Sequence, residues 1–200
     1  MKPTPAASLV ALLLALSAAT SSARDDSGAV PLTRDVPSLV RKTCRQLARH
    51  TRLHVVCPPL VPKTRIVRIA GIYGFFSALE LPKPPRRRLT EYYEMSFNNG
   101  GPFGSIHWIV AKGTPEAVRY WVLSDRHNEV KGKPHRVGVL RIAGRAAEIY
   151  RFPWFPAGGE FGSHLAAFVR SGPFVYVASI HGYDDPGASA RMAVAMANAD

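Results

Sequence analysis

The sequence predicts an α+β domain in which a mainly antiparallel β-sheet meander carries an N-terminal and a C-terminal helix on one face. Three observations lead to this prediction. An amphipathic helix fits residues 37–52, short apolar or alternating runs typical of strands follow between 65 and 181, and an alanine-rich helix closes the chain after Asp185. Strands and helices do not alternate as they do in βαβ units, so a parallel sheet is not expected.

The first helix has a recognisable start. Pro37 suits its first turn, and Asp35 or Ser38 can serve as its cap. Its apolar positions follow the spacing of one helical face, namely Val40, Cys44, Leu47 and Ala48.

The segments that follow are expected to be strands separated by turn residues. In the first half these strands are 65–69, 72–79, 90–97 and 105–111, with a turn at 98–102. Thr114, Pro115 and Glu116 then predict a short helix over 115–123. The run 118–122 also fits a strand, so this helix has an alternative.

Two hairpins and a helix complete the predicted fold. One hairpin pairs 136–143 with 145–152 around Gly144, and the other pairs 160–170 with 173–181 around Ser171-Gly172. The closing helix takes Asp185 as its cap and Pro186 in its first turn. Its apolar face consists of Ala188, Met192, Ala195, Met196 and Ala199.

The N-terminus reads as an export signal. A short cationic start, an apolar stretch centred on 9–14 and a run of small residues ending at Ala23 are typical of a cleavable signal peptide over 1–23. An uncleaved anchor over 3–23 is the alternative. We therefore expect a flexible segment 24–36 and a single globular domain 37–200, secreted or extracytoplasmic, with no transmembrane span once the signal is removed.

The two cysteines, Cys44 and Cys57, predict one disulfide. An exported chain folds in an oxidising compartment, and no third thiol competes for the pairing. Two buried free thiols are the alternative. The spacing of the two cysteines lacks the paired pattern of a zinc site, so neither a metal nor another cofactor is expected.

Positive charge is concentrated in the first third of the chain. The 200 residues hold 26 Lys and Arg against 14 Asp and Glu, a formal charge of +12. Residues 24–88 hold 14 basic and 4 acidic side chains, whereas 89–200 hold 11 and 10. No acidic residue occurs between Val36 and Leu79.

The cations of the first helix fall on a stripe beside its apolar face. They are Arg41, Arg45, Arg49 and Arg52, with Lys42 beside them, and the loop 83–88 adds Arg86, Arg87 and Arg88. Such a stripe suits an anionic envelope lipid or wall polymer. The alternative is a solvated face that keeps the protein soluble. No zinc finger, helix-turn-helix or RNA-binding aromatic pattern accompanies the charge, so nucleic-acid binding is not expected.

The last hairpin gathers the residues that suit chemistry best. With Ser171-Gly172 as the turn, the strand period of two places His164, Ser179 and His181 on one face. These side chains suit a metal site or an acid–base pair. No nucleophile elbow, zinc-protease motif or phosphate-binding glycine loop is present.

The last third also resembles known proteins. The run Gly162-Ser163-His164, the strand 172–182 and the alanine-rich end are similar to uncharacterised exported proteins of actinobacteria-like bacteria. In outline these resemble small extracytoplasmic domains of the lipoprotein-carrier and anti-sigma-associated kind. The resemblance covers about 136–199 and implies a location outside the cytoplasm, with no activity and no catalytic residues to carry over.

The sequence thus favours an exported, non-enzymatic domain that binds an anionic envelope component through its basic first third. A hydrolase or metal-dependent enzyme using His164 and His181 is the first alternative. A structural envelope protein without a ligand is the second.

Overall fold

A computed structural model describes residues 29–63, 68–71, 76–77, 89–98, 105–123, 134–152, 164–181 and 184–200. Within these residues the helices are α1 (Ser38–His50), α2 (Pro115–Leu123) and α3 (Pro186–Ala199). The strands of the larger sheet are β3 (Arg68–Gly71), β4 (Phe76–Ser77), β5 (Leu89–Asn98), β6 (Ser105–Gly113), β7 (His135–Ile142), β8 (Arg145–Arg151), β9 (His164–Ser171) and β10 (Phe174–His181). A smaller sheet pairs β1 (Leu32–Thr33) with β2 (Val61–Pro62).

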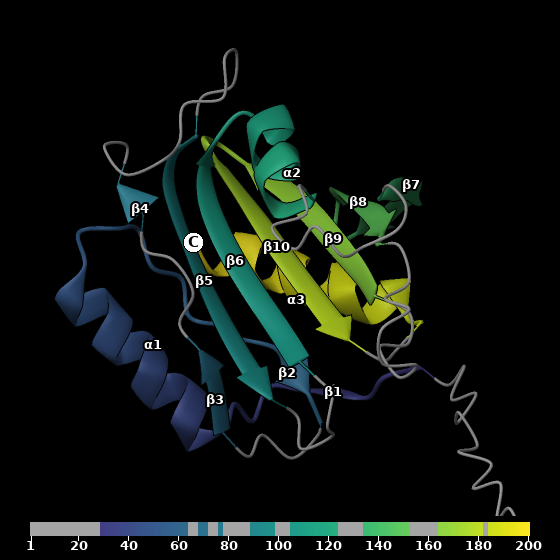
Figure 1. Ribbon diagram of the computed structural model, residues 1–200. Helices are drawn as coiled ribbons and strands as arrows, with labels where there is room; N and C mark the ends of the chain where they lie inside the picture. Colours follow the sequence, from purple (N-terminus) through teal and green to yellow (C-terminus); the bar gives the residue numbers. More distant parts are fainter. Residues whose placement is uncertain are drawn as a thin grey trace, which may run out of the picture.

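The larger sheet is antiparallel throughout its described strands. Its order is β3-β5-β6-β10-β9-β8-β7, and β4 also pairs with β5. Strands β7 to β10 form a meander, and β10 then pairs with β6, so the centre of the sheet joins two segments far apart in sequence (Figure 1). The α+β class with a mainly antiparallel sheet is confirmed.

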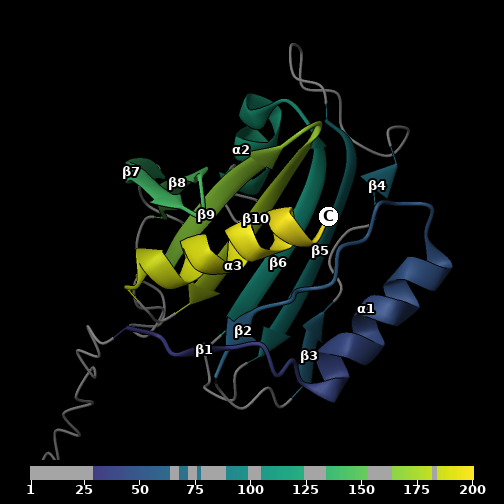
Figure 2. The same ribbon diagram turned by 180° about the vertical axis from the view of Figure 1, so that it is seen from behind.

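The helices lie on both faces of the sheet. α3 crosses the strands on the face seen in Figure 2, and α1 packs into the same hydrophobic core at the β3 side. α2 lies on the opposite face, over a second and smaller core (Figure 1). The N-terminal and C-terminal helices therefore share one face as predicted, whereas the short helix between them covers the other.

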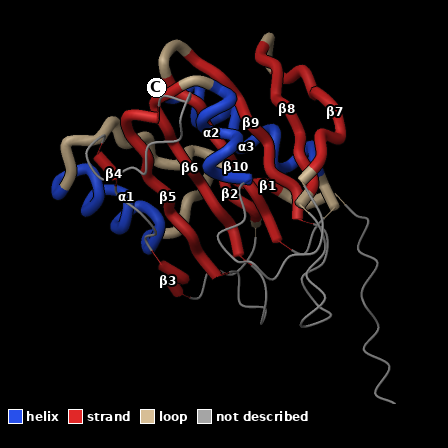
Figure 3. Tube along the Cα trace, turned by 45° about the horizontal axis from the view of Figure 1, so that its top comes forward, coloured by secondary structure: helices blue, strands red, loops and turns tan. Residues whose placement is uncertain are grey.

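Figure 3 shows α1 and β7 at opposite edges of the sheet. α1 lies beside β3 and β4, and β7 forms the far edge beyond β8. Arg136 and Arg141 on β7 are exposed there. They are cations remote from α1.

The predicted helix caps and the predicted short helix agree with the structure in part. Asp185 caps α3 as predicted, because one oxygen of its carboxylate accepts from the amide of Ala188 at 2.9 Å. Neither Asp35 nor Ser38 caps α1: Pro37 occupies the cap position, and no side chain bonds to the first turn. The predicted helix over 115–123 is confirmed, so the strand alternative for 118–122 is wrong.

The apolar face of α1 is shifted from the predicted one. Its buried side contains Val40, Thr43, Cys44 and Leu47, while Ala48 is exposed. Spacings of three and four residues define this face, and Thr43 completes it in place of Ala48. The hydroxyl oxygen of Thr43 is buried there without a hydrogen-bond partner among the described residues.

The two hairpin turns differ in how well the sequence located them. Ala143 and Gly144 form the first turn with φ of 48° and 77°, the left-handed pair that a two-residue hairpin requires. In the second hairpin Ser171 pairs with Phe174, so the turn is Gly172-Pro173 and the predicted turn Ser171-Gly172 is wrong. The register moves by two residues, which leaves every side chain on its predicted face.

Several predicted features lie outside the described residues. These are the signal peptide 1–23, the loop 83–88 with Arg86, Arg87 and Arg88, and most of the predicted strands 65–69 and 72–79. The segment 24–36 is described from Ala29 onward, where Val30 is buried and its amide donates to Asp185 at 2.8 Å. Among the described helices, none has the length and apolar character needed to cross a membrane.

Candidate functional site

The first candidate site is the outward side of α1. We call it the basic stripe, and it consists of Arg41, Lys42, Arg45, Arg49 and Arg52, all of them exposed. Arg52 lies just beyond the helix, and Arg41 also donates to the carbonyl of Val36. Within the described part of the chain, none of the five forms an ion pair with a carboxylate. The stripe therefore presents uncompensated positive charge to its surroundings.

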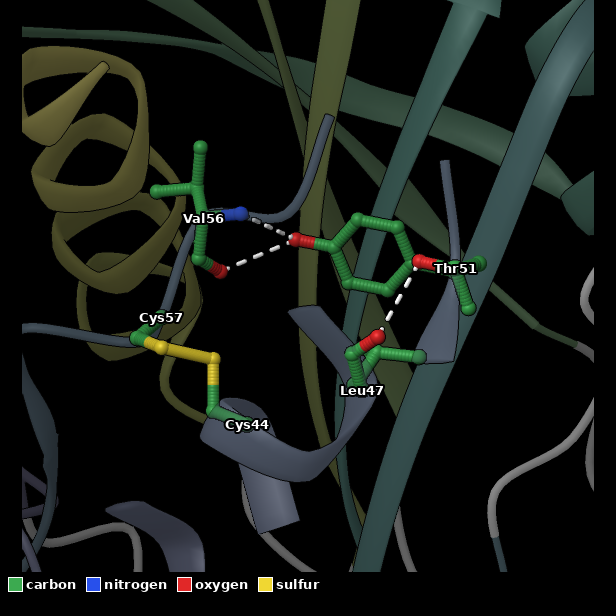
Figure 4. The surroundings of a disulfide bond; sticks show 6 residues. Cys44, Leu47, Thr51, Val56 and Cys57 are labelled. Atoms are coloured by element: carbon green, nitrogen blue, oxygen red, sulfur yellow. Dashed lines mark hydrogen bonds between the residues drawn. A yellow bond between two sulfur atoms is a disulfide. The ribbon is translucent and has the colours of Figure 1, made fainter. Parts of the chain in front are cut away.

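The opposite side of α1 is fixed to the domain by a disulfide. Cys44 and Cys57 are bonded, with Cα atoms 5.6 Å apart, as the sequence predicted (Figure 4). The next residue back, Val56, is held by Tyr93 of β5, whose hydroxyl donates to the Val56 carbonyl at 2.9 Å and accepts from its amide at 2.8 Å. Burial raises the pKa of Tyr93 well above its usual range, so the hydroxyl stays protonated.

The second candidate site lies on the α2 face of the sheet. We call it the histidine cluster, and it consists of Glu94 on β5, His107 on β6, and Ser179 and His181 on β10. Three neighbouring strands contribute, because β6 lies between β5 and β10. His107 is directly opposite Ser96 of β5 on one side and Ser179 on the other.

A chain of hydrogen bonds orients the imidazole of His107. Its Nδ1 lies 2.7 Å from one carboxylate oxygen of Glu94, and the hydroxyl of Tyr92 donates to the other oxygen at 2.8 Å. The side chains of His107 and Glu94 keep 19% and 15% of their area exposed, so solvent reaches the pair at this edge. A carboxylate on Nδ1 is the arrangement that leaves Nε2 as the proton-accepting nitrogen.

His181 stacks on His107. The two ring centroids are 4.7 Å apart with the planes 30° from parallel. Burial, and then the neighbouring His107, lower the pKa of His181 to about 3. His181 is therefore neutral at physiological pH.

The structure brings together two of the three residues predicted from the last hairpin. Ser179 and His181 lie in the cluster, and the backbone of His164 pairs directly with that of His181. The side chain of His164 lies outside the described residues, and so does Gly162. Sequence reasoning missed Glu94 and His107. The available signal was one histidine, His107, inside the predicted strand 105–111, and one glutamate, Glu94, inside the predicted strand 90–97.

Other parts of the described chain offer less. A shallow hollow of about 390 Å³ lies at the start of α2, lined by Thr90, Lys112, Gly113, Thr114, Pro115, Glu116, Arg170 and Pro173. Its charge is mixed, because Lys112 is paired with Glu91 at 3.0 Å and Glu116 lines the same hollow. No group of three or more His, Cys, Asp or Glu that could hold a metal ion occurs among the described residues.

Comparison with known proteins adds no family: no family model, no curated protein and no solved structure matches the chain. The candidate sites therefore rest on their own residues.

Proposed function

We propose that the protein is an exported domain that binds an anionic surface of the cell envelope through the basic stripe of α1. The observation that carries the proposal is the uncompensated charge of the stripe on a helix whose other side is fixed by a disulfide. The signal-like segment 1–23 supports the export. A disulfide supports it too, because disulfides form and persist in an oxidising compartment.

The geometry of the stripe suits a surface. Arg41, Arg45 and Arg49 are four residues apart on a helix, so they span about 12 Å of its length within an arc of about 80°. A flat anionic layer can contact all three at once. Each basic side chain near an anionic membrane contributes about 1 kcal/mol to binding.

The chemistry of the exposed side favours attachment without insertion. Ala48 is the apolar side chain exposed beside the arginines, and Leu39 packs on the core. A helix that inserts into a bilayer presents large apolar side chains on the buried side of the interface. The stripe instead offers guanidinium groups, which bind phosphate oxygens in pairs. We therefore place the contact at phosphate groups of the surface.

Vesicle binding tests this proposal. The purified secreted protein should bind vesicles of phosphatidylcholine with phosphatidylglycerol and not vesicles of phosphatidylcholine alone. Arg45→Gln with Arg49→Gln should weaken that binding roughly 30-fold, at about 1 kcal/mol for each charge. Arg136→Gln with Arg141→Gln removes two exposed cations from β7 and should change affinity less than threefold.

Salt and a second ligand complete the test. Binding through exposed charges falls steeply as ionic strength rises, because the screening length shortens to about 3 Å at 1 M. Binding that survives 1 M salt would contradict the proposal, and so would an equal loss in both double variants. A phosphate-bearing wall polymer is the second ligand to be tested. Failure to bind both the vesicles and the polymer would favour a structural role.

A further inference from the structure

The larger sheet ends in a long edge strand, β7. Among the described strands β7 is last in the order, and its pairing partner there is β8. It has eight residues, none of them proline or lysine. The strands at the opposite edge, β3 and β4, have four and two residues and lie beside α1 (Figure 3). Short edge strands, proline and lysine are devices that keep other strands from pairing at an edge, and β7 has none of them.

The hairpin turn determines which backbone groups of β7 face outward. With the two-residue turn ending at Gly144, Ile142 and Arg145 are the pair that exchanges hydrogen bonds next to it. Alternate residues of β7 then bond to β8, and the residues between them direct their N–H and C=O away from it. Val139 and Arg141 are such outward residues. Each offers one donor and one acceptor to a strand added at this edge.

Apolar side chains accompany these backbone groups. Val137 and Val139 are 49% and 42% exposed, while Leu140 and Ile142 pack in part on the main core. The register with β8 shifts between Arg136 and Gly138, so Val137 is the extra residue of a bulge. The regular part of the edge is therefore 138–142, with an exposed valine at each side of Gly138.

Positive charge lies at each end of this apolar stretch. Arg136 and Arg141 are exposed, and neither forms an ion pair with a carboxylate among the described residues. The carboxylate opposite Val139 on β8 belongs to Glu148, and it is bonded to Arg119 at 3.0 Å. A carboxylate near each end of an added strand would complement the two arginines. A second copy of β7 would instead bring four arginines to one strand pair.

We propose that β7 is a docking edge for an extended segment of another protein, with apolar residues at the centre of the segment and a carboxylate near each end. In strand addition the main-chain hydrogen bonds supply affinity, and the side chains supply specificity. Here Val139 supplies both an outward backbone and an apolar contact, and the arginines select for acidic ends. The proposal does not depend on the basic stripe of α1.

A synthetic peptide tests the proposal. The probe is the fluorescein-labelled octapeptide Thr-Glu-Val-Val-Thr-Val-Glu-Thr, and its binding to the secreted protein is measured by fluorescence polarisation. The same peptide with N-methyl groups on its four central amides keeps the charge but cannot form the ladder, so it should bind at least about tenfold more weakly. Bound peptide should also slow hydrogen exchange at the amides of Val139 and Arg141.

Variants of the protein separate strand addition from attraction by net charge. Val139→Pro removes an outward N–H that does not bond to β8, and should weaken peptide binding at least about tenfold. Arg136→Gln with Arg141→Gln should weaken it about fivefold. Arg45→Gln with Arg49→Gln is the matched control, since it removes two exposed cations from α1, and should change it less than about twofold.

Three results would overturn the proposal. The first is equal binding of the parent and N-methylated peptides, or equal losses in the two arginine variants, because net charge would then explain the binding. The second is the absence of peptide binding to folded protein. The third is a concentration-dependent mass of the parent protein with slow exchange at Val139 and Arg141 before peptide is added, which would make a second copy the partner. None of these results bears on vesicle binding by α1.

Discussion

The same strands give the two faces of the sheet different properties. Alternate residues of β6 show this contrast. Ile106, Trp108 and Val110 point to the face covered by α1 and α3, where each is at most 2% exposed. The alternate residues His107 and Ile109 point to the α2 face, where the imidazole is held by Glu94. The period of two lets one strand build an apolar core on one side and a polar cluster on the other.

The described helices on the two faces differ in length and in how they cross the sheet. α3 has 14 residues and crosses the sheet, with small side chains that allow close packing, namely Ala188, Ala190, Ala193 and Ala197 (Figure 2). α2 has 9 residues and lies over one end of the opposite face (Figure 1). The polar cluster occupies the part of that face that the smaller core does not include.

The largest expected difference comes from one substitution made on each face. Ile106→Ala should lower the free energy of unfolding by about 4 kcal/mol, since the side chain is fully enclosed and leaves a cavity. Ile109→Ala, three residues along β6, should cost about 3 kcal/mol, because Ile109 is 5% exposed and packs in the smaller core. Chemical denaturation of both variants gives the comparison. Equal losses would show that the two faces are equally well packed.

Removal of the disulfide tests how much of the stability on the α1 side comes from a covalent link. Cys44→Ser with Cys57→Ser should lower the free energy of unfolding by about 3 kcal/mol, because the unfolded chain regains the entropy of an open loop. Reductant should reproduce the loss in the parent protein and have no effect on the double variant. A loss below about 1 kcal/mol would mean that Tyr93 and Val56 hold this segment without the disulfide.

Acid should affect the α2 face through His181. Its pKa is about 3 in the folded protein and 6.5 in the unfolded chain, so the unfolded state binds the extra proton between these values. Stability is full above pH 6.5 and falls as pH decreases toward 3, by about 2 kcal/mol between pH 7 and pH 5. His181→Gln should remove most of that slope, whereas His135→Gln on exposed β7 should not. A slope unchanged in His181→Gln would refute the assignment.

Helices, caps and turns were predicted better from the sequence than the pairing of strands was. Local signals located the helix at 115–123, the cap at Asp185 and the turn at Gly144, because each depends on a few adjacent residues. Cys44 and Cys57 were paired because no other cysteine exists. The turn of the second hairpin was placed one residue early, which shifts the pairing by two, since Gly172-Pro173 and Ser171-Gly172 both resemble turns.

The histidine cluster shows what such signals leave out. Ser179 and His181 were found because their strand pairs with the preceding one in a hairpin. His107 was missed because β6 pairs with β10, a partner about seventy residues later that no local pattern specifies. Its bond to Glu94 is diagonal between β5 and β6, because Glu94 is opposite Ile109, and it therefore needs the register of that strand pair.

Two consecutive tyrosines on β5 give the smallest and most closely matched comparison. Tyr93→Phe removes a hydroxyl that satisfies both the amide and the carbonyl of buried Val56, so we expect a loss of about 1.5 kcal/mol. Tyr92→Phe removes a donor to Glu94, a carboxylate that solvent still reaches, so the loss should be about 0.5 kcal/mol.

Denaturant midpoints measured on the two variants give the comparison. Equal losses in the two variants would show that the hydroxyl of Tyr93 contributes no more at Val56 than the hydroxyl of Tyr92 does at Glu94.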